Sequence, residues 1–121
     1  MTGSRGRVLI VDDQYLIREF LKVWVEAHNF EVCGSAKTAQ GAIEQALLQR
    51  PDIILMDFRL EGDRDGVDAA LKIVQSIKTR IIYVTGSSEE STIARINEDH
   101  PFAILIKPID PAELGRVMMQ A

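Results

Sequence analysis

Five short apolar runs, separated by longer segments with helical spacing, constrain the fold of this chain most strongly. The runs are rich in β-branched residues and give way to polar residues, as buried strands do. They span residues 7–11, 30–34, 52–56, 81–84 and 102–106. Strands that alternate with helices form a parallel sheet with helices on both faces. The sequence therefore predicts a doubly wound α/β fold with five helices, and five-stranded sheets of this kind commonly have the order 2-1-3-4-5.

Apolar residues at three- and four-residue spacing predict a buried stripe on four of the five helices. The expected stripes are Ile17, Phe20, Leu21, Trp24 and Val25 in the first helix, Ile43, Ala46 and Leu47 in the second, Val67, Ala70, Leu71 and Val74 in the third, and Leu114, Val117 and Met118 in the fifth. Capping residues mark the helix starts. Thr38 precedes the second helix, Ser87 and Glu90 have capping-box spacing at the fourth, and Asp110 stands before Pro111 at the fifth.

Length and charge limit the remaining possibilities. A chain of 121 residues suggests one domain, expected over residues 7–121 after a flexible N-terminus at 1–6, with no further domain after the fifth helix. The net charge of −4 argues against a nucleic-acid-binding surface. No apolar run approaches the ~20 residues of a membrane span, and the chain begins without a secretion signal. We therefore expect a cytoplasmic protein with no membrane contact.

Polar side chains follow the predicted strands at their carboxyl ends. Asp12 and Asp13 follow the first strand, Asp57 the third, Thr85 the fourth and Lys107 the fifth. The carboxyl ends of parallel strands share one edge, and order 2-1-3-4-5 places strands one and three side by side at the point where such folds bind ligands. Asp12 and Asp13 also suit the cap of the first helix, and Thr85 suits a helix entry. The topology nevertheless predicts that all five side chains converge in one crevice.

Three clustered carboxylates need a proton or a cation among them. Two unit charges about 4 Å apart repel by roughly 4 kcal/mol at an effective dielectric constant near 20. Oxygen ligands without His or Cys select a hard ion, Mg²⁺ or Mn²⁺. A metal beside a carboxylate, a lysine and a hydroxyl indicates phosphoryl transfer, which depends on positioning and charge neutralisation. Asp57 would then be the nucleophile, with Lys107, Thr85 and a backbone N–H on the phosphoryl oxygens.

These residues also follow the pattern of one known family. The chain resembles the receiver domain of two-component response regulators, of the stand-alone type, from about residue 7 to its end. The resemblance rests on Asp12-Asp13, Leu55-Met56-Asp57 with the later Gly66, Thr85-Gly86 and Lys107-Pro108. It implies a flavodoxin-like receiver fold. It also implies that Asp57 receives a phosphoryl group from a sensor histidine kinase or a histidine phosphotransfer protein of a phosphorelay, and that a conformational switch signals to a downstream protein.

The resemblance implies roles for the site residues as well. Asp13 and Asp57 would bind Mg²⁺ directly, with the backbone carbonyl of Arg59 as a third protein ligand and Asp12 acting mainly through water. A cis peptide bond is implied before Pro108. The domain would be a signalling protein rather than an enzyme, although it would assist its own phosphorylation and dephosphorylation.

One position departs from the family pattern. Receivers usually carry an aromatic residue three positions before the lysine, and this chain has Ile104 there. Tyr83 and Phe102 are the candidates to take over its part in the switch. Arg59 and Ser87 flank the phosphate position, so we expect them to tune the access of the attacking water.

Three other functions share parts of this pattern. A phosphohydrolase with an aspartate nucleophile needs a second acid two residues further on, where this chain has Arg59. A flavin-binding module needs a hydroxyl- and glycine-rich loop in place of Asp12-Asp13-Gln14. A receiver used only for docking, without phosphorylation, would not need the complete acidic set. For the phosphorylated receiver, we expect the face around Ile93, Ile104 and Leu114 to change.

Overall fold

The computed structural model describes residues 4–86 and 89–121. Its elements are β1 (Arg7–Val11), α1 (Tyr15–Ala27), β2 (Glu31–Ala36), α2 (Ala39–Gln49), β3 (Ile53–Met56), α3 (Gly66–Val74), β4 (Arg80–Thr85), α4 (Glu90–Asn97), β5 (Ala103–Ile106) and α5 (Pro111–Gln120). Within this described part, the strands form one parallel sheet in the order β2-β1-β3-β4-β5. The predicted doubly wound fold and its strand order are confirmed. No helix in the described ranges is long and apolar enough to cross a lipid bilayer.

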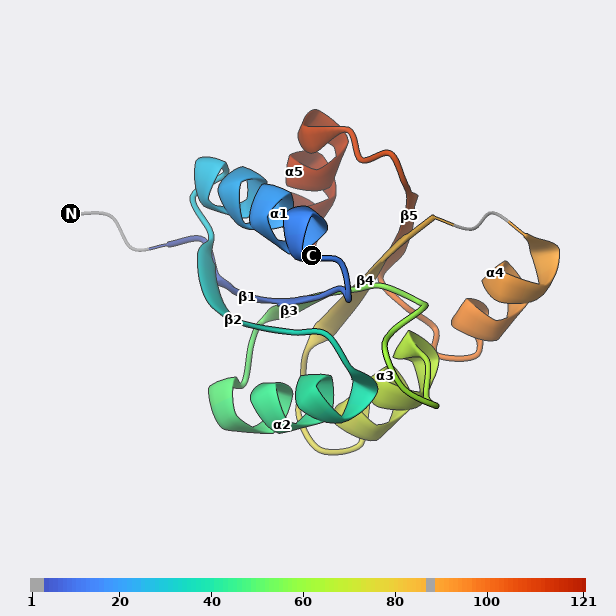
Figure 1. The fold of residues 1–121 in the computed structure, drawn as a ribbon. Coiled ribbons are helices and arrows are strands. Elements are labelled where there is room, and N and C mark those ends of the chain that lie inside the picture. The colour runs from blue at the N-terminus through green and yellow to red at the C-terminus, as the bar shows by residue number, and fades with distance from the viewer. Residues whose placement is uncertain (1–3, 87–88) are drawn as a thin grey trace.

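Helices cover both faces of the sheet (Figure 1). Alternate side chains of β1, β3 and β4 point to opposite faces, as the pleat of a strand requires. Ile10, Leu55 and Ile82 pack with α1 and α5, whereas Ile54 and Tyr83 pack with α2, α3 and α4. All five are almost completely buried, so the inner strands read as continuous apolar runs in the sequence.

The buried stripes of the helices are narrower than predicted. Phe20, Leu47 and Val74 were expected in the core, but each exposes 42% or more of its surface. Each directly follows or precedes a buried residue, and one step along a helix turns the side chain by about 100°. In α1, Leu21 and Val25 face the sheet, and the Phe20 ring instead stacks on Trp24 with ring centroids 5.9 Å apart.

The helix caps agree with the sequence at two of three predicted places. The Thr38 side chain accepts a hydrogen bond from Gly41 N at 2.9 Å, and Asp110 accepts one from Ala112 N at 3.0 Å. At the fourth helix the predicted capping box is wrong, because α4 begins at Glu90 with Glu89 in the N-cap position. Ser87 itself lies outside the described residues.

Candidate functional site

The register of the central strands brings distant residues to one edge of the sheet. Val11 pairs with Met56 at the ends of β1 and β3, so Asp12 and Asp57 leave the sheet side by side. The Asp57 N–H donates to the Val11 carbonyl at 2.9 Å, which extends this pairing to the acid itself. On the neighbouring strands, the Lys107 N–H donates to the Thr85 carbonyl at 2.8 Å.

The three acids form a cluster that is partly closed to solvent. Carboxylate oxygens of Asp12, Asp13 and Asp57 all lie within 4.8 Å of one another. Asp12 is 1% exposed and Asp57 6% exposed, whereas Asp13 is half-buried. Asp12 Oδ1 also accepts from Gln14 N at 2.9 Å, so this side chain shapes the entry to α1 as well. The alternative that Asp12 or Asp13 caps α1 is wrong, because Gln14 is the N-cap residue and no side chain of the described residues caps the helix.

Lys107 is the cation that reaches these acids. Its Nζ lies 2.8 Å from Asp12 Oδ2 and 3.4 Å from Asp57 Oδ2. Burial alone would lower the pKa of Lys107, but the hydrogen bond to Asp12 and the charge of Asp57 raise it above its ordinary value. The ammonium group therefore stays charged between the two buried carboxylates. The peptide bond between Lys107 and Pro108 is cis.

One lysine does not neutralise the cluster. Burial, followed by the charge of Asp12, raises the pKa of Asp57 to about 6, even though Lys107 lowers it. The acids therefore hold net negative charge at neutral pH and favour a second cation. Three carboxylates with no sulfur or imidazole ligand among them are the ligand set of a hard divalent ion such as Mg²⁺.

The acids open into a pocket with a volume of about 540 Å³. Its lining residues are Asp13, Gln14, Asp57, Arg59, Thr85, Gly86, Glu89 and Lys107. The structure thus gathers the predicted residues Asp13, Asp57, Arg59, Thr85 and Lys107, while Ser87 lies outside the described residues. Gln14 and Glu89 were missed by the sequence reasoning. Gln14 comes directly after Asp12-Asp13, so the rule that found the acids could have included it, whereas Glu89 enters the pocket through the position of α4.

Gly66 allows the loop after Asp57 to close tightly. A Cβ atom at Gly66 would lie 2.1 Å from the Asp57 backbone oxygen, so no larger residue fits without moving the chain. The Gly66 N–H donates to the Phe58 carbonyl at 2.7 Å, and α3 begins at this residue. Gly66 therefore holds the segment that follows Asp57 close to the end of β3.

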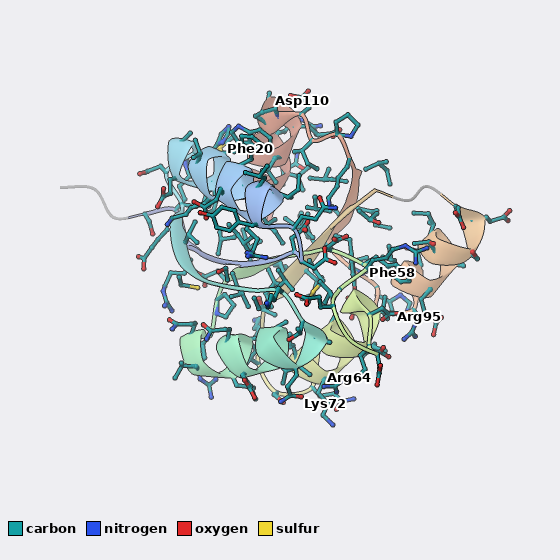
Figure 2. The ribbon with its side chains drawn as sticks, in the orientation of Figure 1. Phe20, Phe58, Arg64, Lys72, Arg95 and Asp110 are labelled. Carbon is teal, nitrogen blue, oxygen red and sulfur yellow. The ribbon has the colours of Figure 1, made fainter. Side chains whose placement is uncertain are left out.

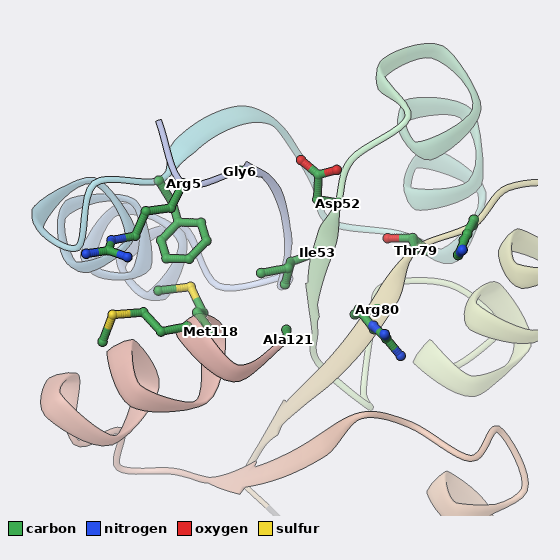
Figure 3. Close-up of a pocket in the computed structure, with 11 residues that line it drawn as sticks. Arg5, Gly6, Asp52, Ile53, Thr79, Arg80, Met118 and Ala121 are labelled. Atoms are coloured by element: carbon green, nitrogen blue, oxygen red, sulfur yellow. The ribbon is translucent and has the colours of Figure 1, made fainter. Parts of the chain in front are cut away.

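A second pocket of about 540 Å³ lies at the opposite edge of the sheet (Figure 3). Arg5 and Arg80 both line it but extend in different directions. The Arg80 guanidinium lies over the Phe102 ring, 5.6 Å from its centroid, and the Asp52 carboxylate accepts from Arg7 N at 2.8 Å. This pocket therefore does not direct a convergent set of reactive groups at one point.

The sequence matches the family profile of the response regulator receiver domain over residues 8–118. It is similar to the transcriptional regulatory protein PdtaR of Mycobacterium tuberculosis, with 34% identity over 89% of this chain and 52% of that protein. It is also similar to the transcriptional regulatory protein SrrA of Staphylococcus aureus, with 34% identity over 90% of this chain and 44% of that protein. The chain thus spans about half the length of these relatives.

Solved structures give the same result. The signal receiver domain of a modulated diguanylate cyclase from Desulfovibrio desulfuricans G20 has a TM-score of 0.90 and 33% identity, covering 96% of this chain and 92% of that one. The response regulator domain of Thermotoga maritima CheB has a TM-score of 0.82 and 28% identity, covering 95% and 96%. By sequence profile and by similarity to solved receivers, this chain belongs to the response regulator receiver domain family.

Proposed function

We propose that this domain accepts a phosphoryl group on Asp57 from a phosphohistidine of a sensor histidine kinase or a histidine phosphotransfer protein, in a reaction that needs Mg²⁺ or Mn²⁺. The observation that carries the proposal is the convergence of Asp12, Asp13 and Asp57 with the Lys107 ammonium. This arrangement supplies a nucleophile, one cation and a ligand set for another.

In the proposed transfer, an ionised Asp57 oxygen attacks phosphorus while the phosphorus–nitrogen bond of the donor breaks and the imidazole leaves. With a pKa of about 6, Asp57 is largely ionised at pH 7. Lys107 and Thr85, which both line the pocket, would donate to phosphoryl oxygens. A bound Mg²⁺, held by Asp13, Asp57 and the carbonyl of Arg59, with Asp12 acting through water, would neutralise charge on the phosphoryl group.

The phosphoryl group would leave by hydrolysis of the acyl phosphate. Arg59 lines the pocket and would tune the access of the attacking water, together with Ser87. A phosphohydrolase acting on a separate substrate is the alternative, but the position expected for its second acid holds Arg59. Steady release of phosphate from an added phosphoester would favour that alternative. A docking receiver that is never phosphorylated would leave the complete acidic set without a use.

The direct test is phosphoryl transfer to the purified domain. With Mg²⁺ and a small acyl-phosphate donor, we expect one phosphoryl group per chain, seen as a second band on a phosphate-affinity gel. Chelation of divalent ions should abolish uptake because the carboxylates then repel the incoming anion. Asp57→Asn should remain unmodified, whereas Asp63→Asn, a change in the exposed loop, should behave as wild type. Uptake by Asp57→Asn equal to that of wild type would contradict the proposal.

The outer face of α1 is the surface we assign to the phosphate-donating protein. Leu16, Phe20 and Val23 lie at three- and four-residue spacing and are 65%, 52% and 61% exposed. Exposed apolar residues gathered on one helix mark an interaction surface. The helix begins directly after Gln14, which lines the acceptor pocket, so a protein on this face would stand beside Asp57. Figure 2 shows Phe20 on this helix.

Phe20→Ser should therefore slow transfer from a protein donor by roughly tenfold or more, as loss of an aromatic anchor in an interface does. Transfer from a small acyl-phosphate donor should keep its wild-type rate, because the pocket itself is unchanged. Leu48→Ser removes an apolar residue on α2 that is 73% exposed and serves as the matched control. An equal loss with both kinds of donor would place the defect in the pocket rather than in docking.

The signal would pass to a downstream protein in the cytoplasm, with neither nucleic acid nor membrane as a direct partner. Of the three residues predicted to mark the face that changes on phosphorylation, two are at the surface and one is not. Ile93 and Ile104 are half-buried and can report a change at the surface, but Leu114 is completely buried on the side of α5 that packs on the sheet. Leu114 would therefore report a change in packing rather than a contact.

A further inference from the structure

Helix α4 is attached to the rest of the domain by a small apolar contact and by polar links. In α4, whose residues are all described, the buried side chains are Thr92 and Ile96. Arg95 extends from α4 toward α3 (Figure 2) and lies 3.4 Å from Asp65 and 2.8 Å from Asp68. Few buried contacts and a large polar contribution are features of elements that open at low cost.

The second polar link joins the end of α4 to the sheet. Asp99 lies just after the helix, and its Oδ2 accepts a hydrogen bond from the Tyr83 hydroxyl at 3.2 Å. Tyr83 is a completely buried residue of β4, two positions before Thr85, so both side chains lie on the same face of the strand. Burial raises the pKa of Tyr83 and that of Asp99. Tyr83 is therefore a protonated donor at any physiological pH.

Only one of the two carboxylate oxygens of Asp99 takes part in the hydrogen bond to Tyr83. The other carboxylate oxygen of Asp99, Oδ1, is buried without a hydrogen-bond partner among the described residues. A buried carboxylate with one unmet oxygen gains by moving toward water, so the Tyr83 hydroxyl opposes the release of Asp99. Tyr83 also pairs with Ile104 across β4 and β5, at the position where receivers usually have an aromatic residue. Phe102, the other candidate, is partly exposed beside Arg80 instead.

The opposite end of α4 lies at the acceptor pocket. Glu89, the N-cap residue of α4, lines the pocket together with Asp57 and Thr85. A phosphoryl group adds about −1.5 to −2 charges at Asp57. Glu89 would then face a like charge, while Thr85 would be drawn toward it. Helix α4 therefore starts with the Glu89 carboxylate at the acceptor pocket. It ends beside Asp99, which accepts a hydrogen bond from Tyr83 of β4, the strand that also carries Thr85.

We infer that phosphorylation of Asp57 releases α4 from the domain through contacts at both ends of the helix. At its start, Glu89 is repelled from the pocket. At its end, the Tyr83–Asp99 hydrogen bond is the contact that breaks. Tyr83 takes the coupling role that the residue at position 104 has in other receivers. The inference rests on the proposed function, because it needs a phosphoryl group on Asp57. Two states result: α4 held by Tyr83 when Asp57 is free, and α4 released when Asp57 is phosphorylated.

Amide exchange of residues 90–97 tests this coupling in the whole domain, with and without phosphorylation by a small acyl-phosphate donor. In wild type, phosphorylation should speed exchange in α4 by roughly three- to tenfold, the effect of losing one net hydrogen bond. Tyr83→Phe keeps the ring and removes the hydroxyl. Exchange in its α4 should already be fast before phosphorylation, and the further response should disappear. Asp99→Ala removes the acceptor of the same hydrogen bond, so exchange in its α4 should also be fast before phosphorylation and should not respond further.

The controls separate coupling from simple destabilisation and from failure of the proposed function. Tyr15→Phe changes the other tyrosine, which is 64% exposed on α1, and should respond as wild type. A merely structural role of Tyr83 would speed exchange throughout the domain and leave the phosphorylation response of α4 in place. A wild-type response in both Tyr83→Phe and Asp99→Ala would overturn the inference. Wild-type protein that takes up no phosphoryl group would instead overturn the proposed function.

Discussion

The Asp57→Asn domain is expected to be more stable than the wild-type domain at pH 7 without metal, by on the order of 1–3 kcal/mol. Burial, followed by the charge of Asp12, raises the pKa of Asp57 from 3.8 to about 6. Between these values the folded state binds the proton more tightly than the unfolded state does. Stability should therefore fall as pH rises from about 4 to about 6, and the full penalty should persist above pH 6. Asparagine carries no charge, so it removes this penalty.

Urea unfolding between pH 5 and pH 8, in the presence of a chelator, checks this expectation. The difference between variant and wild type should grow up to about pH 6 and then level off. Mg²⁺ should stabilise wild type more than the variant, because the ion binds the charged acids of the folded state. Asp63→Asn, in the exposed loop, should leave stability unchanged. Equal stability of wild type and Asp57→Asn above pH 6 would mean that the cluster is not electrostatically strained.

Lys107→Met is expected to have the largest destabilising effect of any single change in the pocket. It leaves the carboxylates of Asp12 and Asp57, whose side chains are 1% and 8% exposed, without their cation. Loss of one partner from a buried ion pair typically costs about 3–5 kcal/mol. Because the pKa of Lys107 is raised above 10.5 in the folded state, its contribution should persist at neutral pH and be lost only as pH rises through the raised value.

Lys37→Met is the matched control for this change. Lys37 lies 3.5 Å from Glu61, and both side chains are more than half exposed. Such surface pairs contribute about 0–1 kcal/mol, so the same substitution should have little effect there. Denaturant unfolding of the two variants under one set of conditions makes the comparison. Mg²⁺ should restore part of the stability of Lys107→Met by taking over charge compensation. Equal losses for the two variants would show that Lys107 does not compensate the buried acids.

The apolar runs were sufficient to predict the sheet and the place of the site. Buried parallel strands must be apolar on both faces, so each polar residue at a strand end had to lie at the edge. With the strand order of doubly wound folds, Asp12, Asp57 and Lys107 could be placed together without coordinates. The structure brings them within ion-pair distance. The sheet and the place of the site could be predicted because the apolar run of a strand and the polar residue at its end can both be read from a few consecutive residues.

Tertiary packing decided the rest. Phe20 and Leu47 fit the apolar spacing of their helices, but both are exposed in the structure. The orientation of each helix against the sheet decides which of its apolar residues are buried. The entry of Glu89 into the pocket and the Tyr83–Asp99 hydrogen bond depend on where α4 lies, and α4 is attached largely by polar contacts between distant segments. Such contacts have no periodic signature in the sequence. The sequence by itself determined the fold and the acidic edge, and the three-dimensional arrangement alone determined which helix connects that edge to the surface.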